Sequence, residues 1–246
     1  MQISPPFGYT EVVPLLKTHR VRLLRAGEVP PFARALNAIP ISYTEFAPAA
    51  RDYPIVFTSG DGGKTYAPVA VLGMSTGENL FRAEEDWAKD VYVPAYVRRY
   101  PFCMARVRLQ DVERRDRLIC VEKACVDDSG GEPLFDDQGE PLAKWRNLQR
   151  LLVEYEADLE RGRELCAILG DYALLQPFSM QATLNAGGQM QLTGMHRVDE
   201  AKIEHLNASQ FKNLANKGIL GRIYAHLLSL ENFKRLLQRR AGGTPA

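Results

Sequence analysis

The chain has few cysteines and none of the spacings that use them. The four cysteines of its 246 residues stand at positions 103, 120, 125 and 166. There is no C-x-x-C pair and no histidine at ligand spacing, which argues against the common zinc and redox motifs. We therefore expect reduced, buried thiols that pack as small apolar side chains. We predict neither a metal site nor a cofactor.

Long apolar runs are missing as well. No stretch of about 18 apolar residues occurs, so no membrane span is predicted. The N-terminal sequence MQISPPFGYTEVVPLL has no basic segment and is interrupted by Pro5, Pro6 and Pro14, which is unlike a secretory signal. These features predict a cytoplasmic location.

The chain also lacks an excess of charge of either sign. The formal net charge is +1, and nucleic-acid binding requires a concentrated basic field. Two segments are locally basic, residues 98–117 and 212–240, and we interpret both as solvated surface rather than a nucleic-acid interface. No G-x-G-x-x-G or G-x-x-x-x-G-K-[ST] loop is present, which removes the usual dinucleotide and phosphate cradles.

What the chain does have is 46% apolar residues, enough for a sizeable core. Apolar residues alternate, or run together between turn residues, in several segments that we predict to be strands. One is a single strand at 19–25. The others form three pairs, which are 53–60 with 65–75 around Asp61-Gly62-Gly63, 103–109 with 117–126 across a charged linker at 110–116, and a hairpin at 177–198 turning at 185–188.

Helical spacing appears twice. Apolar residues recur every three or four positions over residues 141–169, which predicts a long amphipathic helix ending at Gly170. From residue 199 the chain again has helical spacing, with Gly218 between two helices and a frayed end at 242–246. The acidic, glycine-rich stretch 127–139 predicts a long loop, and it lacks the spacing of a calcium-binding loop.

Together these elements predict an α+β fold in which antiparallel hairpins pack on a long central helix, followed by a C-terminal helical segment. We predict a core domain over residues 1–198 and a helical segment over residues 199–246 packed on it.

The segment WAKDVYVPAYVRRYPF, residues 87–102, is the best candidate for a binding site. Aromatic rings supply apolar area with polar groups, and the guanidinium fork binds carboxylates. One interpretation is a pocket for a carboxylate or a peptide. An alternative interpretation places the same rings in the core between the two strand pairs, with an arginine bridging to Glu84, Glu85 or Asp86. The predicted ligand-binding residues are Trp87, Tyr92, Tyr96, Arg98, Arg99, Tyr100 and Asn79, the last of which is equally consistent with a turn.

Several segments taken in order resemble one known family. They are YPIVF, PVAVLG, ENLF before Trp87, YVPAYVRRYPF, LFDDQGEP, LTGMHRVDE and GILGRIYAHLLSLENF. Together they are similar to the bacterial SapC family over nearly the whole chain. The resemblance implies an association with a paracrystalline surface layer, and some members are labelled as transport proteins. It thereby implies an alternative location in the cell-surface layer, reached by an export route that needs no signal. It brings no catalytic residue.

These observations favour a non-catalytic binding or assembly protein that recognises a peptide or protein partner through residues 87–102. The alternative is an enzyme, or an accessory subunit of an enzyme, with a cleft near Arg98, Asn79 and a histidine. No nucleophile motif accompanies the four histidines at 19, 196, 205 and 226. A homo-oligomer, such as a filament or lattice subunit, is a third possibility.

Overall fold

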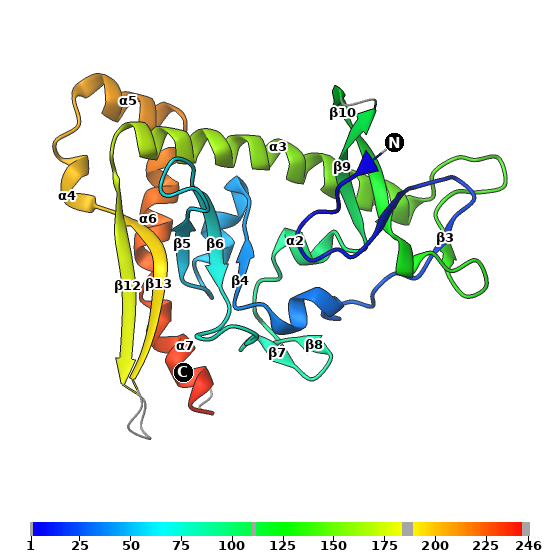
Figure 1. Ribbon diagram of the computed structural model, residues 1–246, viewed down its shortest axis with the longest axis horizontal. Coiled ribbons are helices and arrows are strands. Elements are labelled where there is room, and N and C mark those ends of the chain that lie inside the picture. The colour runs from blue at the N-terminus through cyan, green and yellow to red at the C-terminus, as the bar shows by residue number, and fades with distance from the viewer. Residues whose placement is uncertain (1, 110–111, 184–188, 243–246) are drawn as a thin grey trace. The chain divides into compact units, whose positions relative to one another are not determined.

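The protein is described by a computed structural model that covers residues 2–109, 112–183 and 189–242 (Figure 1). Its contacts divide the chain into two compact units that alternate along the sequence. Unit 1 comprises residues 1–34, 82–88 and 95–157, and unit 2 comprises 35–81, 89–94 and 158–246. A sheet and helices occur together in the chain, which confirms the α+β class. The C-terminal helices belong to unit 2 together with its sheet, so this division does not follow the predicted boundary at residue 198.

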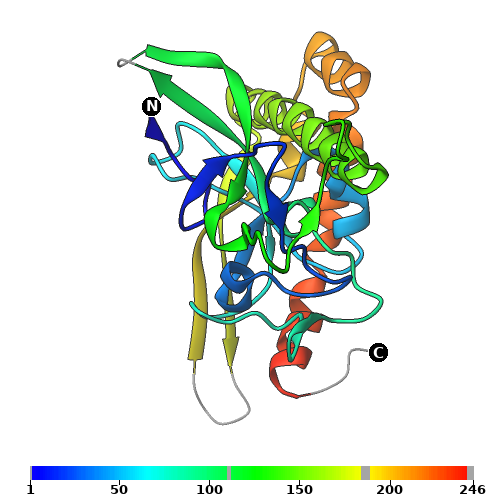
Figure 2. The same cartoon turned by 90° about the vertical axis from the view of Figure 1, so that its right-hand side faces the viewer.

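Unit 1 is built on a four-stranded antiparallel sheet in the order β1-β9-β10-β2 (Figure 2). The predicted strand pair is confirmed as its centre. The strands are β1 (Gln2–Ile3), β2 (Val12–Pro14), β9 (Phe102–Leu109) and β10 (Val112–Glu122). The linker was predicted too long, since β10 already begins at Val112 and pairs there with Leu109.

Shorter elements complete unit 1. The strand predicted at 19–25 is only two residues long, because its partner in the acidic loop is equally short. These pieces are β3 (Arg20–Val21) with β11 (Glu132–Pro133), β7 (Arg82–Ala83) with β8 (Asp86–Trp87), the helix α2 (Ala95–Arg98) and the 3₁₀ turns Pro31–Ala35 and Lys123–Cys125. The core of unit 1 gathers around Phe102, Cys103, Cys120 and Trp145.

The long helix is α3 (Ala143–Asp171), close to the predicted range, and it contributes its first half to unit 1 and its second half to unit 2. Its predicted apolar stripe is largely buried, from Trp145 through Leu152 to Leu169. Gly170 does not end the helix. The helix continues to Asp171, and beyond it Ala173 takes a φ of 51° and its N–H donates to the Gly170 carbonyl.

Unit 2 contains a five-stranded antiparallel sheet in the order β12-β13-β5-β6-β4. Both predicted hairpins are confirmed in it, although the turn 185–188 lies outside the described residues. The strands are β4 (Ala38–Pro40), β5 (Ile55–Thr58), β6 (Ala67–Val71), β12 (Leu175–Thr183) and β13 (Gln189–Val198).

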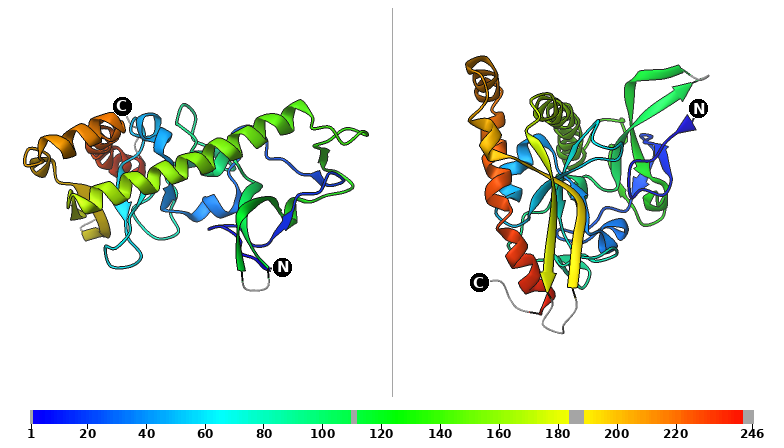
Figure 3. Two further views of the ribbon diagram at one scale, coloured as in Figure 1. Left: turned by 90° about the horizontal axis from the view of Figure 1, so that it is seen from above. Right: turned by 60° about the vertical axis from the view of Figure 1, so that its left-hand side comes forward.

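The predicted helical tail is confirmed, and two of its helices lie beside the β12–β13 hairpin (Figure 3). Phe178 of β12 packs on Phe233 with ring centroids 5.8 Å apart. Gly218 separates two helices in a left-handed conformation, as predicted, while the end 243–246 lies outside the described residues. The helices of unit 2 are the turn Tyr43–Glu45, α1 (Phe46–Ala49), α4 (Glu200–Ile203), α5 (Ala208–Asn216), α6 (Ile219–Ser229) and α7 (Asn232–Arg240).

Candidate functional site: a cavity beside the second half of α3

The aromatic and arginine segment of unit 1 surrounds a buried guanidinium. Arg99 is 3% exposed. Its guanidinium carbon lies 4.1 Å from the ring centre of Tyr96, 4.8 Å from that of Tyr155 and 5.7 Å from that of Tyr9. Burial raises the pKa of Tyr96, although the charge of Arg99 opposes that rise. These contacts make Arg99 the centre of an aromatic cage rather than the rim of an open site.

The acid that faces this guanidinium comes from α3. Arg99 Nη1 lies 3.8 Å from Glu156 Oε1, and Glu156 also pairs with Arg117. Two of the acids predicted to pair with an arginine of this segment bind other arginines: Glu85 pairs with Arg34, and Asp86 lies 2.5 Å from Arg25. The geometry thus favours the core interpretation of the rings, with a different acid as partner.

The other predicted residues of unit 1 divide by burial. Trp87 and Tyr100 are buried, and the Tyr100 hydroxyl lies 3.4 Å from the sulfur of Cys125. Arg98, the residue next to Arg99, is exposed. One helical step therefore separates a buried arginine from an exposed one, as expected for neighbours whose side chains diverge.

Two of the predicted residues, Tyr92 and Asn79, lie in unit 2. The Tyr92 hydroxyl donates to Glu45 Oε1 at 3.0 Å, and its backbone N–H donates to Asp52 Oδ2 at 2.9 Å. Asn79 Oδ1 accepts the N–H of Phe81 at 2.9 Å, which is the turn-forming role that was its alternative. The predicted set is therefore split between the two units, five residues in one and two in the other.

Unit 2 holds a cavity of about 860 Å³ that sequence reasoning missed. It lies between the loop joining β5 to β6 and the second half of α3. The loop is shaped by Asp61, whose Oδ1 accepts the N–H groups of Lys64 and Thr65 and whose Oδ2 accepts the Thr65 hydroxyl. Bonds from Thr65 and Ser59 lower the pKa of Asp61 to about 2. Gly62 and Gly63 supply the positive φ angles that this tight loop needs.

The lining of the cavity combines small apolar residues with a polar rim. Its size lies within the range of small-molecule and peptide pockets. The glycines and alanines of the lining leave this space open, because none of them has a side chain larger than a methyl group. Lys64 and Arg163 provide two cations and Asp171 one anion. The lining residues are Gly63, Lys64, Thr65, Tyr66, Ala67, Arg163, Cys166, Ala167, Gly170, Asp171, Ala173 and Leu175.

Cys166 in this lining is not built as a nucleophile. Burial raises the pKa of its thiol to about 12, so the thiol is neutral near pH 7. The ring of Tyr66 packs edge to face on the ring of His196, with the ring centroids 5.0 Å apart. Arg163 already pairs with Glu160. The arrangement can bind an apolar group and a carboxylate together, with Lys64 on the rim as a donor of charge-assisted bonds.

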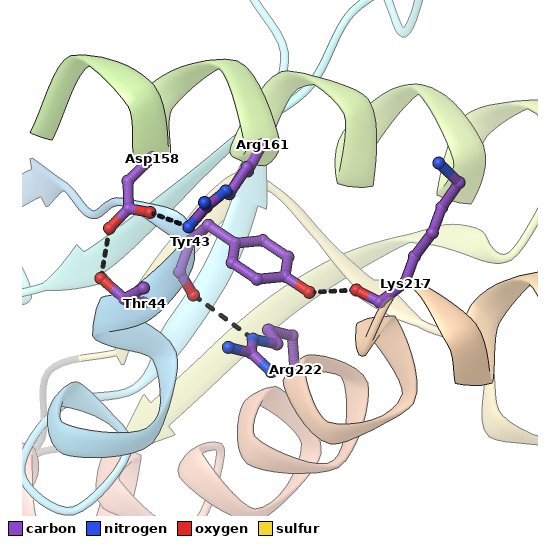
Figure 4. Close-up of polar contacts among 6 residues, drawn as sticks. All are labelled: Tyr43, Thr44, Asp158, Arg161, Lys217 and Arg222. Atoms are coloured by element: carbon purple, nitrogen blue, oxygen red, sulfur yellow. Dashed lines mark hydrogen bonds and ion pairs between the residues drawn. The ribbon is translucent and has the colours of Figure 1, made fainter. Parts of the chain in front are cut away.

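A smaller cavity of about 330 Å³ has Tyr43, Arg161 and Lys217 in its lining. Figure 4 shows the polar contacts of these residues. The surroundings of the cavity are polar groups that bond to one another. Asp158 accepts from Thr44 and from Arg161, and the Tyr43 hydroxyl donates to the Lys217 carbonyl at 2.5 Å. These bonds join the Tyr43–Glu45 turn to α3 and to the α5–α6 connection, so we assign this cluster a structural role.

Comparison with known proteins then places the chain. The family model SapC matches residues 16–236. The chain belongs to the SapC family. No curated protein and no solved structure shows a significant match.

Within the described parts of this SapC family protein, no helix has both the length and the apolar character that a membrane crossing requires. Across the same residues, no three His, Cys, Asp or Glu side chains converge as metal ligands would.

His226 of this SapC protein is a structural residue of unit 2. Strand β13 pairs with β5 at Met195 and His196. Beyond these pairs the imidazole of His226 lies between the two strands and bonds to both. Its Nδ1 lies 2.8 Å from the Ile55 carbonyl, and its Nε2 accepts the Val198 N–H at 3.1 Å. Because Nε2 accepts, the neutral ring carries its proton on Nδ1. Burial lowers the pKa of His226 to about 4.

No single sequence signal marks the 860 Å³ cavity. Its two sides are about a hundred residues apart in the chain, and its small residues follow no motif. Ala167 and Gly170 interrupt the larger side chains on one helical face, which is the nearest thing to a signal.

Proposed function

We propose that this SapC family protein is a non-catalytic binding protein that recognises a peptide or protein partner, and that the partner enters the cavity beside α3. The observation that carries the proposal is the 860 Å³ cavity, whose lining combines small apolar residues with charged ones. Pockets that bind ligands combine apolar lining with a few placed polar groups.

The rim suggests the chemistry of the recognised segment. Lys64 is suited to a carboxylate, while Arg163 already pairs with Glu160. The small residues around Ala167 leave room for an apolar side chain. Asp171 adds an acceptor for a backbone or terminal N–H group. A chain end with an apolar final residue satisfies all three features.

The cavity replaces residues 87–102 as the proposed recognition site. Trp87, Tyr96 and Arg99 are each no more than 5% exposed, so a partner reaches them only if unit 1 opens. A surface-layer role, implied by the family resemblance, is a narrower form of the same proposal in which the partner is an envelope polypeptide.

The test is a binding selection on the full chain with a matched pair of variants. Immobilised ten-residue peptides with free carboxyl ends are the probe. Ala167→Leu fills the cavity, whereas Ala157→Leu makes the same change at another exposed position of α3 outside it. We expect the unmodified chain to select peptides with apolar ends, and the first variant alone to lose them.

Two results would contradict the proposal. One is the absence of any selected peptide class. The other is equal retention of the selected peptides by both leucine variants. The enzymatic alternative makes a separate demand, because replacing a catalytic histidine would reduce a rate by about 10²-fold or more. Replacing His205 or His19 singly should leave peptide binding unchanged.

A further inference from the structure

The hairpin of β12 and β13 lies in a part of the chain that has almost no charge. Residues 172–196 contain no Asp, Glu, Lys or Arg, although these four residue types make up 25% of the chain. At that frequency, a segment of this length would include about six charged residues. Glutamine, serine and threonine side chains supply the polarity of the hairpin instead.

Strand β12 is also an edge strand of the unit 2 sheet (Figure 1). Among the described residues it pairs with β13 alone. An edge strand presents N–H and C=O groups that can pair with another chain, and proteins commonly block such an edge with charged side chains, proline or a bulge. β12 has Pro177 near its start and no charged side chain. Beyond Pro177 the edge is therefore open to a further strand.

The pairing with β13 shows which backbone groups of β12 face outward. The Asp199 N–H donates to the Leu174 carbonyl at 2.8 Å, so residue 174 bonds toward β13. In an antiparallel ladder the direction of these bonds alternates along the strand. Pro177 therefore falls at an outward-facing position, where its missing N–H leaves no gap in the existing ladder.

The irregularity of this hairpin does not disturb β12. Between the pairs made by Phe178 and by Met180, β12 has one residue and β13 has two, so the extra residue lies on β13. Gly194 of β13 has a φ of 76°, as the first residue of such a bulge often does. The alternation of β12 is unbroken. The residues beyond Pro177 whose backbone groups face outward are Ser179, Gln181 and Thr183.

We propose that β12 pairs with β12 of a second copy of this chain, antiparallel about a two-fold axis at Gln181. Pairing all three outward residues places Gln181 opposite its own copy and Ser179 opposite Thr183 of the partner subunit. Both exposed edges then gain backbone hydrogen bonds, and the two five-stranded sheets become continuous.

The missing charge favours a second copy over a different partner. In a symmetric pairing, each side chain near the axis faces its own copy, so any charge there would face a like charge. A strand without charge meets this requirement. A foreign strand imposes no such condition, because its own charges could be opposite in sign.

The experiment measures the association of the full chain by sedimentation velocity from about 5 µM to about 1 mM. Gln181→Lys and Gln181→Glu each place like charges opposite one another at the axis. Gln191→Lys is the matched control, because Gln191 is the cross-strand neighbour of Gln181 on the inner strand β13 and is also exposed. An equimolar mixture of the two Gln181 variants brings opposite charges together at the axis.

We expect reversible dimerisation with a Kd of about 10⁻⁵ to 10⁻⁴ M, as is usual for a small interface. Each Gln181 variant alone should dimerise about tenfold more weakly or worse, whereas Gln191→Lys should stay within about twofold. The mixture should recover association as a heterodimer, a pattern that only a residue facing its own copy produces. Recovery in the mixture also shows that both variants fold.

Backbone amide exchange locates the contact. The Gln181 N–H should exchange more slowly at concentrations that form the dimer, whereas the Met180 N–H, which faces β13, should not change. A chain that stays monomeric at about 1 mM overturns the proposal. So does an equal loss of association in Gln191→Lys, or a mixture that fails to recover. Protection of Gln181 only after a peptide is added would identify a foreign strand and would also overturn the pairing of two copies.

Discussion

Replacing His226 with phenylalanine should destabilise the protein in a way that depends on pH. The imidazole bridges Ile55 and Val198 from a fully buried position. The imidazole packs edge to face on Phe57 with ring centroids 5.0 Å apart, and a phenyl ring would keep this contact. It would leave the Ile55 carbonyl and the Val198 N–H without their imidazole partner. Each buried unpaired group costs about 1–3 kcal/mol, so we expect a loss of about 2–6 kcal/mol at pH 7.5.

The pH dependence follows from the lowered pKa. Burial holds the pKa of His226 at about 4 in the folded chain, below its usual 6.5. The unfolded chain therefore takes up the proton first as the pH falls. The stability that His226 contributes is complete above pH 6.5 and is lost as the pH falls toward 4. A shift of this size corresponds to about 3 kcal/mol.

Urea unfolding of both proteins at pH 7.5, 5.5 and 4 measures this effect. The stability difference between the two should shrink by about 3 kcal/mol over that range, because the carboxylates common to both proteins cancel. His205→Gln, at an exposed position, is the control and should leave the pH profile unchanged. A stability difference that is the same at pH 7.5 and pH 4 would refute the reasoning.

Three further predictions concern other parts of the chain. Gly218→Ala should lower the unfolding free energy by about 1–2 kcal/mol in urea, because its φ is 68°, whereas Gly221→Ala should raise it by up to about 1 kcal/mol within α6. Glu156→Gln should lower the unfolding free energy by about 3–5 kcal/mol, because it removes the charged partner of the buried Arg99. Glu154→Gln, at an exposed position of the same helix, should change it by less than about 0.5 kcal/mol. Similar losses in the two variants would contradict the aromatic cage around Arg99. At pH 8 the Cys166 thiol should react with a disulfide reagent about a thousandfold more slowly than after unfolding, as followed by peptide mass spectrometry, and rapid labelling of the folded chain would contradict its burial.

Local signals predicted the regular elements well. The hairpin around Asp61-Gly62-Gly63 and the long helix were both predictable, because turn chemistry and periodicity are properties of neighbouring residues. Gly218 was predictable for the same reason. The short length of β3 within the predicted strand 19–25, and its pairing with β11, were not predictable, since each strand depends on a partner more than a hundred residues away.

The candidate site was harder to predict because the composition of a segment does not show which of its side chains are buried. The segment 87–102 contains residues suited to binding, yet its Arg99 faces Glu156, which lies on helix α3 more than fifty residues further along the chain. A guanidinium among tyrosine rings serves a core as well as it serves a pocket. The cavity in unit 2 could not be predicted because its space is left by small side chains, which have no functional group that would single them out in the sequence.

The alternation of the two units along the chain limits how the protein can be dissected. Units 1 and 2 exchange the chain at residues 34, 81, 88, 94 and 157, the last of these within the unbroken helix α3. No single cut in the gene therefore yields either unit as a continuous fragment. Truncation at any of these points removes pieces of both sets of contacts, so binding activity should be assigned with point variants in the intact polypeptide.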